Sequence, residues 1–296
     1  MAASTALVAA ESILALTPIA IKKTPLDPIS TLWSRILPSA GIGYTLTTDK
    51  HLTLAEQAGA VALGGTNLLH IAASYEAFRN LPAGQAMSLL YTYPVWNLVF
   101  GTIYSGESIN GRDWLLMGVA AVGSFFLNLD PSNLTSISHT TDTLGRRANA
   151  SWGIFMGLIM ALTESAMHTI LREIKWLDPS KAVWIVNSSA GIWLMAISLL
   201  QITLFGPINE ARGTWGDFIW LSVFHGVTMF SGYWLRFYAV PRLSTVTYSI
   251  LSYAGLLAAF IFGAMFIGER PGWMSIIGAV LIMLSGVILQ QQSLIP

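Results

Sequence analysis

The chain of 296 residues has no cysteine and little charge. Without cysteine it cannot form disulfides, thiolate metal sites or cysteine nucleophiles. Charged residues make up only 10% of the sequence, and its 15 basic residues are balanced by 15 acidic ones. Such a chain has no excess positive charge with which to bind nucleic acid through the phosphates, so nucleic acid is not expected as a partner.

Common catalytic and metal-binding motifs are also missing. The sequence contains no His-Glu-x-x-His zinc motif, no glycine-rich phosphate loop ending in Lys-Ser or Lys-Thr, and no Gly-x-Ser-x-Gly nucleophile elbow. We therefore expect neither an enzyme nor a metal or other cofactor site.

Hydrophobic residues are abundant, at 54% of the chain, and the mean hydropathy is +0.61. A bilayer core about 30 Å thick requires about 20 apolar residues per helix. About ten apolar runs of this kind lie between short polar breaks, at approximately 4–21, 29–47, 55–78, 83–105, 113–129, 151–171, 181–204, 216–238, 243–267 and 273–290. The sequence thus predicts an all-α integral membrane protein that crosses the bilayer about ten times. We favour the plasma or inner membrane, and an organelle membrane remains open.

The chain divides into two similar halves. A polar linker at 130–150 separates a first five-helix repeat, 1–129, from a second, 151–296. Residues 77–108 align with 239–270 without a gap, and this alignment pairs two tyrosines and two Gly-Glu dipeptides. Internal repeats of this kind are typical of transporters.

The beginnings of the two halves also correspond. Glu11-Ser12, followed by Leu-Asp-Pro, is repeated as Glu164-Ser165, again followed by Leu-Asp-Pro. If each half contains five helices, an odd number, the second half must enter the membrane from the opposite side. The sequence therefore predicts an inverted repeat.

The pattern at the end of each half resembles the drug/metabolite transporter superfamily and its ten-helix, EamA-like carriers. It is carried by LPAGQAMSLLYTYPVWNLVFGTIYSGES, followed by WLLMGVAAVGSFFL, and by LSTVTYSILSYAGLLAAFIFGAMFIGER, followed by MSIIGAVLIMLSGVIL. The resemblance implies a carrier with both termini in the cytoplasm, a central substrate cavity between the repeats, and alternating access.

The sequence departs from that superfamily at two places. The superfamily often has proline in both its fourth and ninth helices, whereas this chain has Pro94 in the fourth and Gly255 in the ninth, which we take as the candidate hinges. Glu11 and Glu164 stand where the first and sixth helices often carry tryptophan. In this respect the chain is similar to the small multidrug resistance transporters, whose first-helix carboxylate binds protons and cationic drugs in competition.

The two glutamates are the leading candidates for the functional site. An ionised side chain at the bilayer centre costs roughly 2.5–3.5 kcal/mol, so Glu11 and Glu164 should face the protein interior. Burial favours the protonated carboxyl group, so both could bind and release protons. His168 follows Glu164 by one helical turn and is a candidate to relay that proton. Arg236 lies near the end of an apolar run, where snorkelling to the membrane surface would explain it, and is not expected in the site.

Further polar residues lie within the apolar runs. Tyr91 and Tyr253 correspond across the repeat and offer ring faces and hydroxyl groups to a cationic solute, although packing is an equal alternative. Asn67, His70 and His225 are weaker candidates for binding solute or protons. Hydrogen bonding between helices is the more common role of such residues.

These features favour a secondary transporter of a small organic solute bearing an ammonium group, such as an amino acid, an amine or a cationic drug. Transport would be coupled to protons by competition at Glu164 and Glu11. The alternatives are an exchanger of anionic metabolites, such as sugar phosphates or nucleotide sugars, and a membrane scaffold or enzyme on the same fold. The expected partners are the solute, protons and the lipid bilayer, and a homodimer is left open.

Overall fold

The computed structural model describes residues 2–81, 83–104, 106, 108–128, 149–174, 178–205, 213–266 and 272–292. Within these ranges the chain is helical apart from short connections, and no strand occurs in them. Almost all of the predicted linker at 130–150, and the glutamates of both Gly-Glu dipeptides, fall outside the described residues. The boundaries between the two halves therefore stay a prediction.

The described residues form ten helical spans, which confirms the predicted all-α fold. Seven spans are single helices: α3 (Pro28–Leu46), α4 (Leu54–Asn80), α7 (Gly111–Asn128), α9 (Ala150–Ile174), α10 (Pro179–Phe205), α11 (Trp215–Ala239) and α14 (Trp273–Gln292). Three are interrupted: α1 (Ala2–Leu14) with α2 (Thr17–Lys23), α5 (Ala83–Leu90) with α6 (Tyr93–Tyr104), and α12 (Thr245–Ser252) with α13 (Ala254–Phe266). A short 3-10 turn, η2 (Val240–Arg242), joins α11 to α12.

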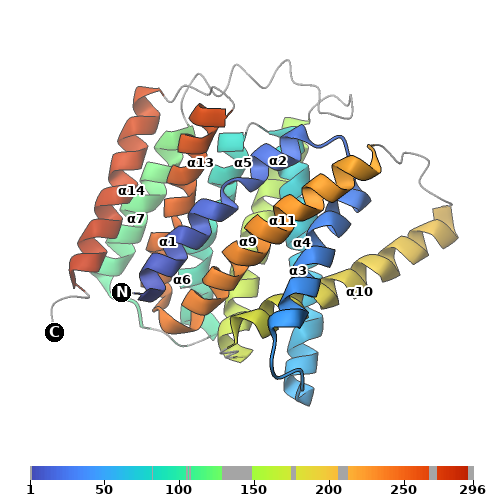
Figure 1. Ribbon diagram of the computed structural model, residues 1–296. Helices are drawn as coiled ribbons and strands as arrows, with labels where there is room; N and C mark the ends of the chain where they lie inside the picture. Colours follow the sequence, from blue (N-terminus) through green and yellow to red (C-terminus); the bar gives the residue numbers. More distant parts are fainter. Residues whose placement is uncertain are drawn as a thin grey trace.

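Four of these spans are long and apolar enough to cross a membrane on length and composition alone: Ala2–Lys23, Ala150–Arg172, Pro179–Leu204 and Thr245–Phe266. The chain enters α1 and leaves α14 on the same side of the bundle (Figure 1), as an even number of crossings requires. Five spans precede the linker and five follow it. Because five is odd, the two halves run through the bundle in opposite directions.

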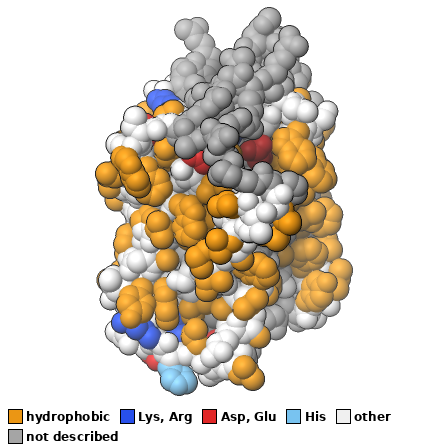
Figure 2. All heavy atoms as spheres, turned by 90° about the vertical axis from the view of Figure 1, so that its right-hand side faces the viewer, with side chains coloured by type: hydrophobic (Ala, Val, Ile, Leu, Met, Phe, Trp, Pro, Cys, Tyr) orange, Lys and Arg blue, Asp and Glu red, His pale blue; other side chains and the backbone are white. Residues whose placement is uncertain are grey.

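The outer surface of the bundle is apolar. Figure 2 shows hydrophobic side chains over the middle of one face, with charged side chains toward its two ends. Ile192, Leu199, Val223 and Val227 are each more than half exposed. A water-soluble protein rarely exposes so continuous an apolar surface, whereas lipid chains solvate it without cost.

The repeated Asp-Pro motif begins a helix in each half. The Asp27 carboxylate accepts a hydrogen bond from the Ser30 backbone N–H at 3.0 Å where α3 begins. The Asp178 carboxylate accepts one from the Ser180 backbone N–H at 2.9 Å where α10 begins. Capping boxes begin α4 and α11, which occupy the same place in the two halves. These capping residues fix where four of the helices begin.

A polar connection at one end of the bundle links the two halves. The Lys181 ammonium of α10 donates to the His51 carbonyl oxygen at 2.7 Å and lies 3.2 Å from the Glu56 carboxylate. The His51 backbone N–H, and then Lys181, lower the pKa of the exposed Asp49 below its usual value. The loop between α3 and α4 is thus held against the second half.

Small residues allow several helices to approach closely. At the crossing of α7 and α14, a Cβ atom on Gly123 would lie 2.7 Å from the Gly278 carbonyl oxygen. At the crossing of α4 and α10, a Cβ atom on Gly64 would lie 2.3 Å from the Ser189 hydroxyl oxygen. Because helices in lipid associate through close packing rather than the hydrophobic effect, these glycines help to hold the bundle together.

The three interrupted helices meet at the centre of the bundle. α1 packs against α12 and α13, α13 packs against α5, and α12 packs against α6. The breaks in the fourth and ninth spans coincide with the paired residues Tyr91 and Tyr253. Pro94 is the second residue of α6, directly after its break, and Gly255 is the second residue of α13. Both residues predicted as hinges therefore lie beside a helix break, and hinge motion at them stays a prediction.

Gly123→Ala should lower the stability of the protein by about 1–3 kcal/mol, because the added methyl group overlaps a backbone atom of α14 that cannot move alone. Gly118→Ala is the matched control on the same helix, where a Cβ atom would meet nothing within 4 Å. It should be neutral or stabilising, since alanine favours helix over glycine. Thermal melting of the detergent-solubilised protein measures both. Equal melting temperatures for the two variants would contradict the close crossing.

Candidate functional site

Both predicted glutamates lie in the interior and share one arginine. Glu11, on α1, is 0% exposed, Glu164, on α9, is 4% exposed, and Arg236, on α11, is 5% exposed. The Arg236 guanidinium donates to the Glu11 carboxylate from Nη2 at 2.9 Å and from Nε at 3.0 Å. Its Nη1 donates to Oε1 of Glu164. The two carboxylates are thus joined through a single cation.

The expectation that Arg236 would snorkel is wrong. Its side chain is 5% exposed, and its guanidinium lies between α1 and α9, where it pairs with the carboxylates of Glu11 and Glu164. These ion pairs hold the guanidinium in the interior, so it does not extend to the surface. The scarcity of charge in the apolar runs was a usable signal, since two buried carboxylates require a nearby cation.

Tyr91 completes the surroundings of Glu11. Its hydroxyl group donates to Oε2 of Glu11 at 3.0 Å, and the Tyr93 hydroxyl lies 3.5 Å from Oε1. Gly255 makes this contact possible, because a Cβ atom there would lie 1.8 Å from the Tyr91 hydroxyl oxygen and 3.0 Å from the Glu11 backbone carbonyl oxygen. The glycine of the ninth span thus leaves room for the tyrosine of the fourth.

Tyr253 does not repeat this arrangement. Its ring centroid lies 6.2 Å from that of Tyr91, and its hydroxyl group points to the Met117 sulfur at 3.9 Å. No hydrogen bond to Glu164 is present among the described contacts of Tyr253. The two tyrosines correspond in sequence, but only one binds a carboxylate.

Glu164 instead meets His70, on α4. The Nε2 atom of His70 lies 3.3 Å from Oε2 of Glu164, and its Nδ1 atom lies 3.1 Å from the Met160 carbonyl oxygen. Within the described residues, no donor reaches Oε2 of Glu164 at hydrogen-bonding geometry. Of the three predicted histidines, His70 is the one that contacts a glutamate.

The other predicted residues lie apart from this cluster. His168 packs against the Tyr248 ring, with centroids 4.2 Å apart, and among the described residues its Nε2 atom has no hydrogen-bonding partner. His225 contacts the Ser34 hydroxyl at 3.2 Å and stacks on Tyr75, which matches the alternative of hydrogen bonding between helices. Asn67 is buried in α4 without a described contact to either glutamate. No relay from His168 to Glu164 is formed in this conformation.

A small cavity adjoins the cluster. It has a volume of about 40 Å³, and the residues that line it include Arg35, His70, Tyr91, Glu164, Tyr233 and Arg236. One water requires roughly 10–15 Å³ of such volume, so a few waters fit, whereas sites for organic ligands are typically about 300 Å³ or more. The structure is therefore a conformation closed around its polar centre.

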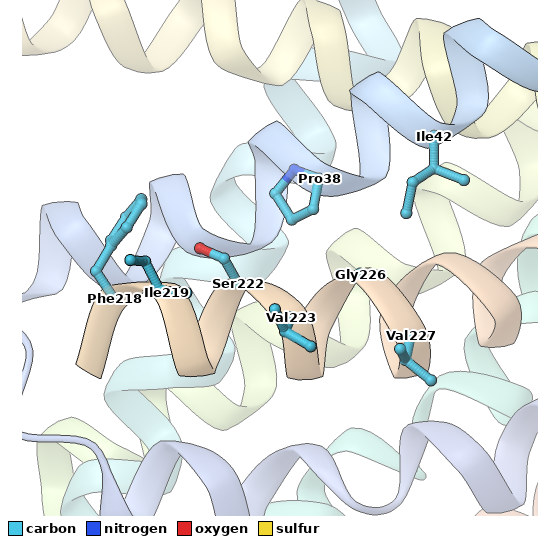
Figure 3. Close-up of a pocket in the computed structure, with 8 residues that line it drawn as sticks. All are labelled: Pro38, Ile42, Phe218, Ile219, Ser222, Val223, Gly226 and Val227. Atoms are coloured by element: carbon cyan, nitrogen blue, oxygen red, sulfur yellow. The ribbon is translucent and has the colours of Figure 1, made fainter. Parts of the chain in front are cut away.

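A larger hollow lies on the outside of the bundle, between α3 and α11. Its volume is about 410 Å³, and the residues that line it include Pro38 and Ile42 of α3 and Phe218, Val223 and Val227 of α11 (Figure 3). The lining is almost wholly apolar, and the valines at its rim are exposed. Such a groove suits the hydrocarbon chain of a lipid rather than a polar solute.

A sequence model of the EamA-like transporter family matches residues 1–129 and 151–290. The chain belongs to the EamA-like transporter family. The predicted resemblance is thereby confirmed, and this EamA-like protein is a membrane protein of a family of small-solute transporters rather than enzymes.

Comparison with individual proteins shows the fold of this EamA-like protein but not its solute. No curated protein matches it in sequence. One solved crystal structure is similar with a TM-score of 0.70, over 98% of this chain and 96% of that chain, at 15% sequence identity. An identity this low shows a shared fold alone. Within the described residues, no group of three or more His, Asp or Glu side chains is arranged to hold a metal ion.

Arg236→Met should destabilise the protein by about 3–5 kcal/mol, because it leaves two buried carboxylates without a cation. Adding Glu11→Gln and Glu164→Gln should restore much of this loss, since the neutral amides no longer require one. Arg242→Met, at an exposed arginine close by in sequence, is the control and should change little. Thermal melting in detergent provides the comparison. If Arg236→Met melted like the control, the buried ion pairs would be refuted.

Gly255→Ala should also destabilise the protein, by about 1–3 kcal/mol, because the methyl group displaces the Tyr91 hydroxyl from Glu11. The effect should shrink in a Tyr91→Phe background, where the overlapping oxygen is gone. A double-mutant cycle on melting temperatures measures this coupling. Additive effects of the two substitutions would show that Gly255 acts independently of Tyr91.

Proposed function

We propose that this EamA-like protein is a secondary transporter that exchanges a small organic solute for protons, and that Glu164 and His70 together hold the proton. The 3.3 Å contact between Nε2 of His70 and Oε2 of Glu164 carries the proposal. Alternating access between the two halves would expose this pair to one side of the membrane at a time.

The Met160 carbonyl supports a proton site at that contact. A carbonyl oxygen only accepts hydrogen bonds, so in the tautomer that satisfies the Met160 carbonyl, Nδ1 of His70 carries the hydrogen. In the neutral imidazole, Nε2 then presents a lone pair to an oxygen of Glu164 that has lone pairs of its own. Two lone pairs at this distance repel. One added proton, on either group, converts the repulsion into a hydrogen bond.

The proton would be coupled to the packing of both halves. Glu164 faces Arg236 through one oxygen and His70 through the other, and Glu11 binds the far side of Arg236. These four residues come from α1 and α4 of the first half and from α9 and α11 of the second. A proton gained at Glu164 weakens its attraction for Arg236 and thereby shifts Arg236 toward Glu11. Protonation thus favours one arrangement of the halves over another.

The geometry also narrows the predicted solutes. Arg236 and Arg35 both line the cavity, and together they balance the charges of Glu11 and Glu164, so a simple amine or a cationic drug would add an unbalanced positive charge. Among the ammonium-bearing solutes considered, an amino acid adds no net charge to the buried centre. We therefore favour amino acids over amines and cationic drugs. The solute's ammonium group would occupy the position at Glu164 that the proton occupies in its absence.

Glu164→Gln should abolish proton movement during transport, because an amide cannot take up the proton. The assay uses purified protein in liposomes that enclose a pH-sensitive dye, with a mixture of amino acids added outside. Glu76→Gln is the matched control, since Glu76 binds Asn80 and Trp152 near the end of α4, outside the central cluster. It should leave proton movement intact. Proton movement of normal size in Glu164→Gln would refute the proposed role.

A further inference from the structure

Arg35, on α3, is a buried cation that forms no ion pair with a carboxylate of the described residues. Its side chain is 4% exposed and lines the central cavity. Among the described residues, the carboxylates of the interior pair with cations other than Arg35. Glu11 and Glu164 pair with Arg236, Glu164 also contacts His70, and Glu76 pairs with Arg79. Arg35 itself donates a hydrogen bond to a neutral group, the Tyr233 hydroxyl, at 2.9 Å.

Tyr233 holds Arg35 beside the cluster but does not neutralise it. The Arg35 guanidinium carbon lies 5.1 Å from the Tyr233 ring centroid, and the Arg236 guanidinium carbon lies 5.3 Å from the same centroid. An aromatic ring stabilises a nearby cation, but much less than a carboxylate does at hydrogen-bonding distance. A buried charge without a counter-charge is costly, and a protein retains one where a ligand supplies the missing partner.

We infer that Arg35 binds the carboxylate group of the transported solute, an amino acid. This inference rests on the proposed function and deepens it. The proposed function places the solute's ammonium group at Glu164, and the inference assigns a binding residue to its carboxylate group. The carboxylate would form a bidentate, charge-assisted hydrogen bond with Arg35. This bond would offset the cost of burying the Arg35 charge. The ammonium group would then lie toward Glu164, which lines the same cavity.

The charges of the centre favour a zwitterion over other ions. Without an added proton, the two carboxylates of Glu11 and Glu164 balance the two guanidiniums of Arg35 and Arg236. A zwitterion preserves this balance, whereas an amine leaves an extra positive charge and a phosphate leaves one or two extra negative charges. A proton shared by Glu164 and His70 makes the centre positive and repels the ammonium group. Proton and amino acid therefore exclude one another, as exchange requires.

Ligand-induced thermal stabilisation of the purified protein in detergent tests the inference with a panel of probes. The probes are the L-amino acids, the amine that corresponds to each without its carboxylate, the corresponding amino amides, and glucose 6-phosphate. At least one amino acid should raise the melting temperature, and its amine and amide should not. Arg35→Gln should weaken binding of that amino acid by about 10- to 100-fold, the loss expected for a hydrogen bond to a charged group.

Two further variants separate binding from folding. Arg35→Lys keeps the charge and should retain part of the stabilisation, whereas Arg79→Gln removes a buried arginine outside the cavity and should retain all of it. Without ligand, Arg35→Gln should melt close to the wild type, because the substitution removes a charge that has no carboxylate partner. A large loss of stability there would assign Arg35 a structural role and overturn the inference.

The remaining outcomes distinguish this inference from the proposed function. If amines stabilised the protein as well as amino acids did, or if Arg35→Gln bound amino acids normally, Arg35 would not bind the carboxylate. The proposed proton exchange through Glu164 is tested separately, by the proton-movement assay. If glucose 6-phosphate alone stabilised the protein, or if no probe did, the inference that the solute is an amino acid would be overturned. If Glu164→Gln moved protons as the wild type does, while Arg35→Gln still weakened amino acid binding, only the proton role of Glu164 would be refuted.

Discussion

The pairing of Glu11 and Glu164 with one arginine is the interaction on which the centre of this protein depends. In a hydrocarbon core each isolated charge would be costly, and both carboxylates are buried. Arg236 compensates both, and it does so from α11 while the carboxylates come from α1 and α9. A single side chain therefore joins the first half to the second. Any motion that separates the halves must first replace these ion pairs.

One cation between two carboxylates also breaks the symmetry of the repeat. Glu11 receives two donors from Arg236 and a third from Tyr91, so both of its oxygens are satisfied as a carboxylate. Glu164 has one donor from Arg236, and its other oxygen faces the imidazole of His70. The carboxylates of Glu11 and Glu164 occupy equivalent places in the repeat but have different neighbours. Such a difference allows two paired carboxylates to hold different protonation states. The repeat supplies the two positions, and the unshared residues His70 and Arg236 make them chemically different.

The sequence was informative where local chemistry decides the structure. Long apolar runs between short polar breaks predicted the ten spans, because bilayer thickness acts on contiguous residues. The inward position of the glutamates followed from the cost of their charge. Partners that come from distant helices were not predictable in this way. The burial of Arg236 depends on how α11 packs against α1, and the choice of His70 over His168 depends on how α4 packs against α9. Equivalence across the repeat misled for Tyr253, because an inverted repeat shares its backbone path but not every side-chain contact.

The closed cavity connects this electrostatics to movement. A volume of about 40 Å³ excludes an organic solute, so the helices around it must separate before one can enter. Helix breaks at Tyr91 and Tyr253 allow the fourth and ninth spans to bend there, and they are tolerated because the surrounding helices shield the freed backbone groups from lipid. Separation alone would leave a buried carboxylate or guanidinium exposed to a low dielectric without its partner. In the proposed mechanism, a proton at Glu164, or a solute with charges of both signs, would remove that penalty. The same ion pairs that hold the two halves together would thus make their rearrangement conditional on what enters the cavity.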